Sequence, residues 1–228
     1  MLTKEVNLMD VHINPKFRIP REELEDNLQI KLQYNGSFEY IIPARDLAEI
    51  HDINLVSNDK LERILRKVKL KDSDVHPYEH SDFGLHRISP SAINIGQSFV
   101  LEGKILDLCK FSQFARAFSL EGFSKLPPLL MKGKDREGNK ACAIYVPPII
   151  ELHEHYTLID GIHRSYLTKS ADTTMNYVIV RNVQAPLPFQ PMQWDFAQQV
   201  SHRPDITDRY VDLKMDLFRD LSTVGIDG

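Results

Sequence analysis

The apolar residues in the N-terminal third of the chain change their period along the sequence. Between residues 28 and 42 they alternate with polar residues on both sides of Asn35-Gly36, a pair that favours a tight turn, and this predicts a β-hairpin. Residues 44–50 have a short helical pattern, and residues 58–69 have a stronger one. The apolar stripe of the stronger helix consists of Leu61, Ile64, Leu65 and Val68. We therefore expect an α+β portion at the start of the chain.

The opposite face of the predicted helix at 58–69 is basic. Its cations are Lys60, Arg63, Arg66 and Lys67. Such a face could attract phosphate groups, but the solvated side of an amphipathic helix has the same composition. We interpret it as a solvent-facing surface.

Residues 70–90 are polar and predict a linker or a long surface loop. The histidines in or near it are His76, His80 and His86. Their spacing, in a segment that contains Pro77 and Pro90, is not that of a helical pair of metal ligands. We expect no metal site in this segment.

The remaining sequence predicts alternating strands and helices. Expected strands or extended segments are 91–100, 127–131, 141–146, 149–152, 156–159 and 175–183. Expected helices are 105–118 and 205–221, a charged turn is expected at 132–140, and residues 184–191 are expected to be irregular. The pattern indicates a mixed α/β chain.

Composition narrows the class of protein without naming a function. The 228 residues are 42% hydrophobic and 26% charged, which is typical of a globular domain and excludes a disordered chain, a fibre and a disulfide-stapled miniprotein. The net charge of −4 disfavours extended contact with nucleic acid. Neither an apolar run long enough to span a membrane nor a signal peptide is visible. Cys109 and Cys142 lack CxxC spacing, so we expect reduced thiols and a cytoplasmic location.

One segment, residues 156–165, combines groups that suit an anion. An apolar strand runs into Asp160-Gly161, and His163-Arg164-Ser165 opens a short helical stretch. Gly161 permits a sharp turn and close approach to the backbone. The first amides of a helix are unpaired and carry the positive end of its dipole. Together with an arginine, a histidine and a hydroxyl group, they predict a phosphate site.

The same segment also has a purely structural interpretation. Asp160 would then cap the helix, Gly161 would serve the turn, and His163 and Arg164 would decorate the surface. If the site is functional, Asp160 would hold a metal ion, orient Arg164 or accept a hydroxyl proton from a substrate. Both interpretations stay open on the chemistry of the residues alone.

The same residues resemble a known signature. Pro148-Ile149-Ile150, followed by the run from Tyr156 to Arg164, is similar to the pattern of the ParB/sulfiredoxin superfamily. Residues 86–90 resemble the opening strand of that fold, residues 105–118 its first helix, and residues 181–183 its closing strand.

The resemblance implies a ParB/sulfiredoxin-like domain at 86–183. The residue pattern adds an N-terminal α+β portion at 1–75 and a C-terminal helical extension at 184–228, which lie outside the resemblance, so we expect a mixed α/β (α+β) fold in three parts.

The resemblance also implies a function for residues 160–165, which we call the box. In that superfamily the box binds the phosphates of a nucleotide, which implies this role for Gly161, Ile162, His163, Arg164 and Ser165. ATP or ADP with Mg²⁺ would be the ligand. Asp160, His163 and Arg164 would be catalytic in phosphoryl transfer or nucleotide hydrolysis, and no metal site made by protein ligands alone is implied. A kinase would need a further carboxylate upstream, for which Glu102, Asp107 and Glu121 are available.

Departures from the pattern separate the branches of the superfamily. Sulfiredoxins have a catalytic cysteine where this chain has Ile162, and the CTP-hydrolysing ParB partition proteins have Glu-Arg-Arg after the glycine. No helix-turn-helix is recognisable after the domain. The Asp-Gly-x-His-Arg form resembles that of free-serine kinases and of DNA-modification and phage-defence proteins.

Two alternatives to a phosphoryl-transfer enzyme remain. One is a non-catalytic module that responds to a nucleotide or to DNA, and the weaker one is a metal-dependent nuclease that uses His153, His155 and Asp160. We expect a nucleotide or a phosphorylated small molecule as the partner, whereas the oligomeric state stays open. Trp194 could stack on a base, but we interpret it as an anchor for the C-terminal segment.

Overall fold

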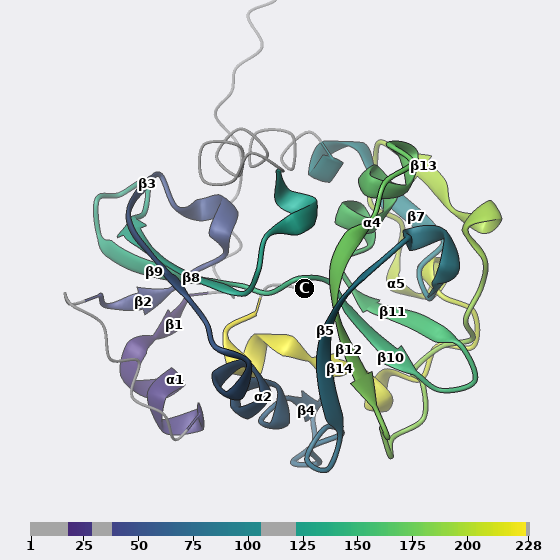
Figure 1. Ribbon diagram of the computed structural model, residues 1–228, viewed down its shortest axis with the longest axis horizontal. Helices are drawn as coiled ribbons and strands as arrows, with labels where there is room; N and C mark the ends of the chain where they lie inside the picture. The colour runs from purple at the N-terminus through teal and green to yellow at the C-terminus, as the bar shows by residue number, and fades with distance from the viewer. Residues whose placement is uncertain (1–17, 29–37, 106–121, 227–228) are drawn as a thin grey trace, which may run out of the picture.

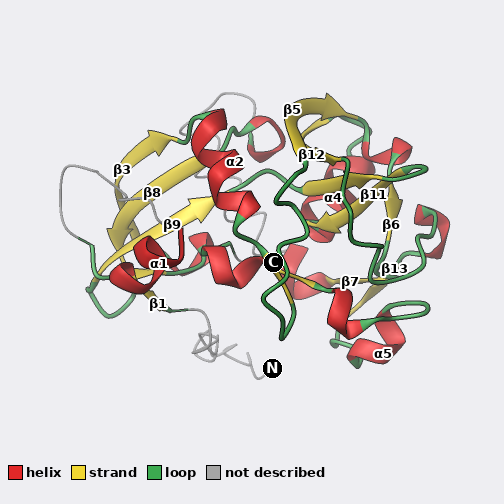
Figure 2. Ribbon diagram, turned by 90° about the horizontal axis from the view of Figure 1, so that it is seen from below, coloured by secondary structure: helices red, strands yellow, loops and turns green. Residues whose placement is uncertain are grey.

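Two mixed β-sheets lie side by side and form the centre of the protein, as the two ribbon views agree (Figures 1 and 2). The computed structural model describes residues 18–28, 38–105 and 122–226. Each sheet has five strands. The C-terminal segment, drawn in yellow in Figure 1, lies between the sheets in that view.

The first sheet combines short N-terminal strands with a long central hairpin. In spatial order its strands are β1 (Ile19–Pro20), β2 (Tyr40–Ile41), β9 (Lys140–Tyr145), β8 (Leu129–Lys134) and β3 (Glu49–Leu55). β2 runs parallel to β9, and the other neighbours are antiparallel. Helix α1 (Arg21–Leu28) buries Leu24 and Leu28 in the adjoining core.

The second sheet carries the segment in which the sequence predicts a phosphate site. In spatial order its strands are β5 (Asp82–Ile88), β12 (Met175–Arg181), β10 (Ile149–Leu152), β11 (Tyr156–Asp160) and β6 (Asn94–Ile95). β12 is parallel to β10 and β11 is parallel to β6, whereas β10–β11 and β5–β12 are antiparallel. Helix α4 (Ile162–Ser170) follows β11 directly (Figure 1).

Shorter elements tie the ends of the chain to these sheets. β13 (Gln198–Val200) pairs with β7 (Phe99–Leu101), and β14 (Arg219–Asp220) pairs with β4 (Lys69–Leu70). Further α-helices are α2 (Asn58–Arg66) and α5 (Ile206–Arg209). Single 3-10 turns are at Ala44–Asp46, Pro90–Ala92, Phe123–Lys125, Trp194–Phe196, Met215–Leu217 and Leu221–Val224.

The chain crosses from the first sheet to the second between β3 and β5 and again, more directly, through Val146-Pro147-Pro148 between β9 and β10. We call the second of these the crossing. Two apolar clusters surround this crossing, and each takes residues from both sheets. In the first cluster, Cys142 from β9 and Val180 from β12 are both fully buried. The sheets therefore share a core rather than forming separate ones.

Several sequence-based predictions are confirmed. The strands expected at 141–146, 149–152, 156–159 and 175–183 correspond to β9, β10, β11 and β12. The extended segment at 127–131 is the start of β8, the turn at 132–140 is shorter than expected because β8 reaches Lys134, and residues 184–191 are irregular. α2 ends three residues before the predicted boundary, buries Leu61, Ile64 and Leu65, and is capped by the Ser57 hydroxyl, which accepts a hydrogen bond from Lys60 N.

The helix predicted at 44–50 is wrong. Ala44–Asp46 form only a 3-10 turn, and β3 begins at Glu49. A register shift between Ile50 and Asp52 leaves both Ile50 and Ile53 packed against the second apolar cluster. Within the predicted helix, Ala44, Leu47 and Ile50 are three positions apart and also pack against this cluster, so their spacing imitates a helical period.

Two longer segments also differ from prediction. The supposed linker at 70–90 contains β5, an edge strand paired along its whole length with β12. The helix predicted at 205–221 is limited to α5, because Tyr210 is extended and Asp212 has a φ of 52°, in the left-handed region. The strand expected at 91–100 is split into a 3-10 turn, β6 and the start of β7.

Part of the prediction falls outside the described residues. The turn at Asn35-Gly36 and most of the helix expected at 105–118 lie there, although residues 102–105 have helical backbone. Leu28, expected to begin a strand, ends α1, and β2 pairs with β1 and β9. The mixed α+β fold is confirmed, whereas its division at 75, 86 and 183 stays a prediction. None of the described helices is long and apolar enough to cross a membrane.

Candidate functional site

The turn between β11 and α4 is shaped by Gly161. Its φ of 91° and ψ of 30° place it in the left-handed region, where a side chain is strained. A Cβ atom here would also meet Cβ of Pro148 at 2.6 Å. The turn therefore packs directly on the crossing between the two sheets. Gly161 is the N-cap of α4 and has no side chain with which to cap the helix.

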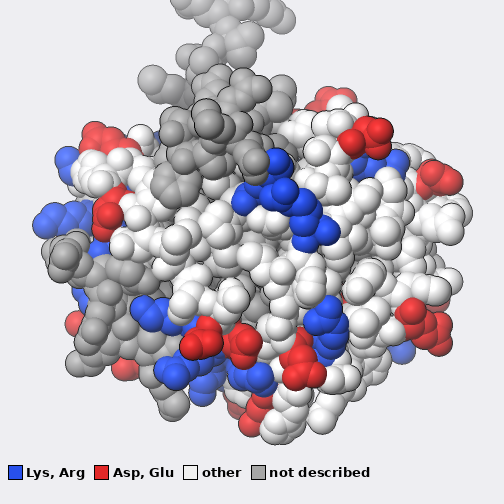
Figure 3. All heavy atoms as spheres, viewed as in Figure 1, with Lys and Arg blue, Asp and Glu red and all other residues white. Residues whose placement is uncertain are grey.

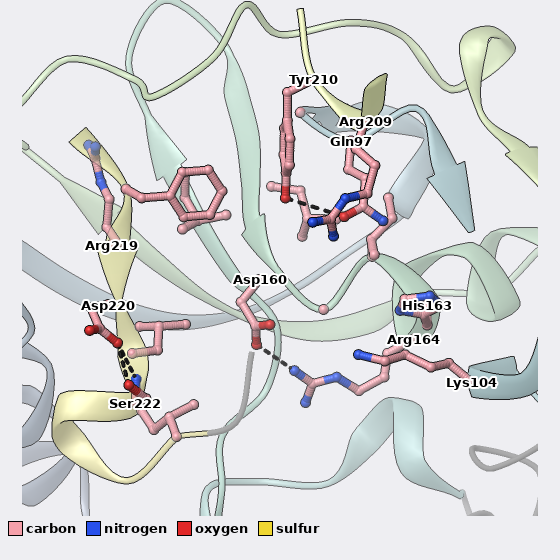
Figure 4. A pocket seen from close by; sticks show the side chains of 18 of the residues that line it. Gln97, Lys104, Asp160, His163, Arg164, Arg209, Tyr210, Arg219, Asp220 and Ser222 are labelled. Atoms are coloured by element: carbon pink, nitrogen blue, oxygen red, sulfur yellow. Dashed lines mark hydrogen bonds and ion pairs between the residues drawn. The ribbon is translucent and has the colours of Figure 1, made fainter. Parts of the chain in front are cut away.

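Arg164 connects this turn to the crossing. Its Nη2 donates to Asp160 Oδ2 at 2.7 Å (Figure 4), and its Nη1 donates to the Val146 carbonyl oxygen at 2.6 Å. The guanidinium carbon lies 5.4 Å from the centre of the Tyr145 ring. Burial lowers the pKa of Arg164, but Asp160 and Tyr145 outweigh it, so the pKa lies above its ordinary value. Of the functional roles expected for Asp160, the orientation of Arg164 is the one this contact fits.

His163 connects the same turn to β7. The Leu101 N–H donates to His163 Nε2 at 3.1 Å, so the ring is neutral and its proton lies on Nδ1. Burial, followed by the charges of Lys104, Arg164 and Arg203, lowers the pKa of His163 from 6.5 to about 3. His163 thus offers an N–H donor rather than a positive charge.

The other two predicted phosphate ligands differ in placement. Ile162 lines the cavity described below and packs partly against the second apolar cluster. Ser165 is fully buried, and its hydroxyl accepts a hydrogen bond from Tyr177 at 3.0 Å. Its side chain faces the sheet and does not line the cavity.

A cavity of about 580 Å³ opens at the first turn of α4. The box lines it from Asp160 to Arg164, the end of β9 contributes Tyr145 and Val146, and the C-terminal segment 203–226 forms much of the remaining wall. Aromatic side chains of Phe99, Phe189, Tyr210 and Phe218 also line it. The volume is within the range of sites for small molecules and cofactors.

The charge of the cavity is mainly positive. Its two carboxylates are Asp160, held by Arg164, and Asp220, whose oxygen accepts from the amide and the hydroxyl of Ser222. Its six cationic side chains are Lys71, Lys104, Arg164, Arg203, Arg209 and Arg219. They come from widely separated parts of the chain and surround a space that suits an anionic ligand.

The other sequence-predicted candidates lie away from this cavity. Glu102 is exposed and does not line it, and Asp107 and Glu121 lie outside the described residues. His153 Nε2 is 2.8 Å from Glu151 Oε2, and no group of three or more His, Cys, Asp or Glu side chains that could hold a metal occurs in the described part of the chain. Cys142 is buried, and burial raises its pKa to about 12.

The interpretation of Trp194 as an anchor is confirmed. Its indole N–H donates to the Pro90 carbonyl oxygen at 2.8 Å, and the side chain packs in the second apolar cluster. The basic face of α2 is partly committed to protein contacts, since Arg66 reaches the Glu79 carbonyl oxygen and lies over the Phe83 ring. Figure 3 shows basic and acidic side chains mixed along the lower rim of one face and a short run of basic side chains near its upper centre.

Comparison with known families identifies the family to which the chain belongs. The model of the family described as the ParB CE domain matches residues 59–199, from the first turn of α2 to within β13. The chain belongs to the ParB CE domain family. No match was found among curated proteins or among solved structures. The ParB CE match includes the whole β11–Gly161–α4 turn, whereas Arg203, Arg209 and Arg219 follow it in the sequence.

Sequence reasoning missed most of the cavity wall, and among Tyr145, Lys104, Arg203 and Arg209 only the first had a visible signal. Tyr145 ends a predicted strand just before Pro147-Pro148, where a change of direction was foreseeable. Lys104, Arg203 and Arg209 reach the cavity only through tertiary folding. Two of them belong to the ParB CE protein's C-terminal segment.

Proposed function

We propose that the protein binds the phosphate groups of a nucleotide or another phosphorylated small molecule in the cavity at the first turn of α4. The observation that carries the proposal is the charge of this cavity, which has six cationic side chains and two carboxylates on its wall, even though Arg219 is already paired with the buried Glu151. The carboxylate of Asp160 is already paired with Arg164. Phosphate is the biological anion that best matches arginine forks combined with free amides at a helix start.

The residues of the box from Gly161 to Arg164 each contribute to phosphate binding in this proposal. Gly161 brings the backbone close to the ligand, and the first-turn amides of Ile162, His163 and Arg164 donate to phosphate oxygens. Arg164 uses two of its five N–H groups on Asp160 and Val146, which leaves others for the ligand. His163 adds the Nδ1 proton of a neutral ring.

A nucleotide fits the cavity better than inorganic phosphate. Phe189 and Tyr210 stack with ring centres 5.3 Å apart, and Phe218 meets Tyr210 edge to face at 5.4 Å. These rings line the cavity and offer an apolar surface for a base. The likeness of the Asp-Gly-x-His-Arg form to that of free-serine kinases and of DNA-modification and defence proteins supports the same ligand class, with ATP or ADP as the first candidates.

Thermal unfolding with a ligand panel tests this proposal. The panel contains ATP, ADP, AMP, CTP, GTP, pyrophosphate and phosphate, each with and without Mg²⁺. A ligand at a hundredfold excess over its Kd stabilises the folded state by about 2.7 kcal/mol. We expect such a shift in the wild type and a smaller one in Arg164→Lys, which cannot make both guanidinium contacts. Arg136→Gln, in the exposed turn before β9, is the matched control and should respond like the wild type.

Absence of a shift with every phosphorylated ligand in the wild type would overturn the proposal. An equal shift in the wild type and in Arg164→Lys would mean that the ligand binds away from the first turn of α4. The ligand-free melting temperature of each variant shows whether a lost response comes from the site or from the fold.

Phosphoryl transfer or nucleotide hydrolysis is the second candidate function, and the presence of Asp160 in the cavity favours it. Asp160 would hold Mg²⁺ together with phosphate oxygens of the substrate, since Mg²⁺ commonly binds through one or two carboxylates and phosphate. The ion would neutralise charge on the transferred group. Asp160→Asn should abolish turnover, whereas Asp220→Asn, on the same wall, should keep it. Binding without turnover in the wild type would instead support the non-catalytic module.

A further inference from the structure

Besides Arg219, the C-terminal segment adds Arg203 and Arg209 to the cavity. Both follow the residues matched by the ParB CE family model, which end at residue 199. Figure 4 shows the guanidinium groups of Arg209 and Arg164 reaching the cavity from different sides, with Asp160 between them in the view. The two arginine groups therefore do not duplicate each other.

The backbone of Arg209 is held firmly in place. Its carbonyl oxygen accepts hydrogen bonds from the Ser98 amide at 2.9 Å and the Ser98 hydroxyl at 3.3 Å. The next residue, Tyr210, donates to Gln97 Oε1 at 3.2 Å and stacks on Phe189. The side chain of Arg209 thus starts from a fixed point on the wall.

The guanidinium group of Arg209 is incompletely satisfied. Its Nε is buried and has no hydrogen-bond partner, one of two such side-chain atoms among the described residues. Arg219, on the same cavity wall, is the opposite case, because it donates five hydrogen bonds to Glu151 and to the carbonyl oxygens of residues 185, 186 and 217. A buried donor without a partner is costly, so Arg209 requires an acceptor that the described protein does not provide.

The arginines also act on their neighbours electrostatically. After burial, Arg203 is the next cause that lowers the pKa of Arg209, and it is among the cations that lower the pKa of His163. No ion pair with a carboxylate of the described chain offsets either Arg203 or Arg209. An anion bound between them would relieve this repulsion.

We propose that Arg203 and Arg209 form a second anion subsite, separate from the first turn of α4, so that the cavity selects ligands with two or more linked phosphate groups. One phosphate group would lie at the α4 turn, and the next would accept the Nε proton of Arg209. The inference rests on the proposed function, because it extends the same cavity. A nucleoside diphosphate or triphosphate is the ligand class, and a monophosphate would occupy only one of the two subsites.

Calorimetric titration of purified full-length variants tests the second subsite. Wild type, Arg203→Gln, Arg209→Gln and Arg209→Lys are titrated with AMP, ADP, ATP and pyrophosphate, and Arg136→Gln is the control. We expect Arg209→Gln and Arg203→Gln to weaken the binding of ADP and pyrophosphate by about tenfold or more, since hydrogen bonds to charged groups are strong. The affinity for AMP should change by less than about twofold, because AMP does not require the second subsite. The affinity of Arg209→Lys for ADP should lie between those of the wild type and Arg209→Gln, because lysine keeps the charge but lacks the forked guanidinium group.

The outcomes separate the two proposals. If the wild type binds none of these ligands, both the proposed function and the second subsite are overturned. If the wild type binds ADP and the arginine variants bind it equally well, the second subsite alone is wrong. Equal weakening of AMP and ADP in Arg209→Gln would also overturn it, because Arg209 would then serve the first phosphate. Loss of pyrophosphate binding along with ADP would identify the phosphates, rather than the base, as the group that Arg209 recognises.

Discussion

Arg164 Nη2 lies 2.7 Å from Asp160 Oδ2, and the two side chains are 14% and 6% exposed. Because Nη1 of the same guanidinium group reaches the Val146 carbonyl oxygen, one side chain joins the end of β11 to the crossing between the sheets. The pair is thus part of the fold as well as of the proposed phosphate site. Variants at these positions need a stability measurement beside any binding measurement.

The first prediction concerns the stability that this pair provides. Arg164→Met should lower the free energy of unfolding by about 3–5 kcal/mol, because it leaves a buried carboxylate and a carbonyl oxygen without their donor. Asp160→Asn should cost about 1–2 kcal/mol, since the amide oxygen still accepts from Arg164. Urea unfolding at neutral pH measures both. Lys69→Met, which breaks an ion pair to the exposed Asp74, should change little, and an equally small change in Arg164→Met would contradict the prediction.

The second prediction concerns the turn itself. Gly161→Ala should cost more than about 2 kcal/mol, because alanine is strained at a φ of 91° and its Cβ would meet Pro148. Gly103→Ala is the matched control, since Gly103 is helical and a Cβ there meets nothing within 4 Å. That variant should gain up to about 1 kcal/mol. Thermal and urea unfolding of the two variants should therefore shift in opposite directions, and a Gly161→Ala protein as stable as the wild type would show that the turn has another conformation.

The contrast between β11–α4 and β3 explains how far the sequence determines the fold. Apolar runs such as the one in β11 are read from local pattern, and the turn at Asp160-Gly161 follows from its residues. The sequence predicts a helix at 44–50, and so misses the start of β3, because Ala44, Leu47 and Ile50 are spaced like helical neighbours. It predicts a linker at β5 because a strand at the sheet edge keeps polar residues such as His86 and Arg87. In both cases the pairing partner, which is distant in sequence, decides the structure.

The candidate site was predictable in the same partial way. Gly161, Ile162, His163 and Arg164 line the cavity because they occupy one turn, whose position follows from the strand before it. Ser165 belongs to the same motif, but its place on α4 turns its hydroxyl toward Tyr177 in the core. Arg203 and Arg209 could not be predicted, because the apparent helical period at 205–221 is broken where Tyr210 stacks on Phe189. That aromatic contact depends on tertiary structure and not on local periodicity.

The third prediction concerns pH. The pKa of His163 is about 3 in the folded protein and 6.5 in the unfolded chain. The unfolded chain therefore takes up the proton first as the pH falls. The contribution of His163 to stability is therefore complete above about pH 6.5 and decreases by up to about 1.4 kcal/mol per pH unit between there and about pH 3. His163→Gln keeps an acceptor for the Leu101 amide but does not titrate.

Urea unfolding of wild type and His163→Gln at pH 7.5 and pH 5.0 checks this. The stability difference between the two proteins should change by about 1–2 kcal/mol in favour of the variant at the lower pH. Carboxylates titrate alike in both proteins and cancel in the comparison. A difference that does not depend on pH would mean that His163 is solvated or charged in the folded state.

The last prediction concerns the bond between the C-terminal segment and β10. Arg219 donates from Nε and Nη2 to the two oxygens of Glu151 at 2.8 and 2.9 Å, and both side chains are fully buried. The Tyr78 hydroxyl donates to the same carboxylate at 2.7 Å. Arg219→Met leaves Glu151 buried without its cation, and we expect a loss of about 3–5 kcal/mol in the free energy of unfolding. Arg219→Lys keeps the charge but cannot make five hydrogen bonds, so it should recover only part of this loss.

The double variant Glu151→Leu with Arg219→Met distinguishes the ion pair from the loss of packing. It removes both buried charges, so it should be more stable than Arg219→Met alone, as urea unfolding would measure. Limited proteolysis should cut residues 203–226 faster in Arg219→Met than in the wild type, because the same side chain holds the carbonyl oxygens of Ala185 and Pro186 against this segment. If Arg219→Met resists protease like the wild type, the segment is held by its aromatic contacts instead. Arg209 would then remain in place, and binding of ADP should survive in that variant, whereas a released segment should lose it.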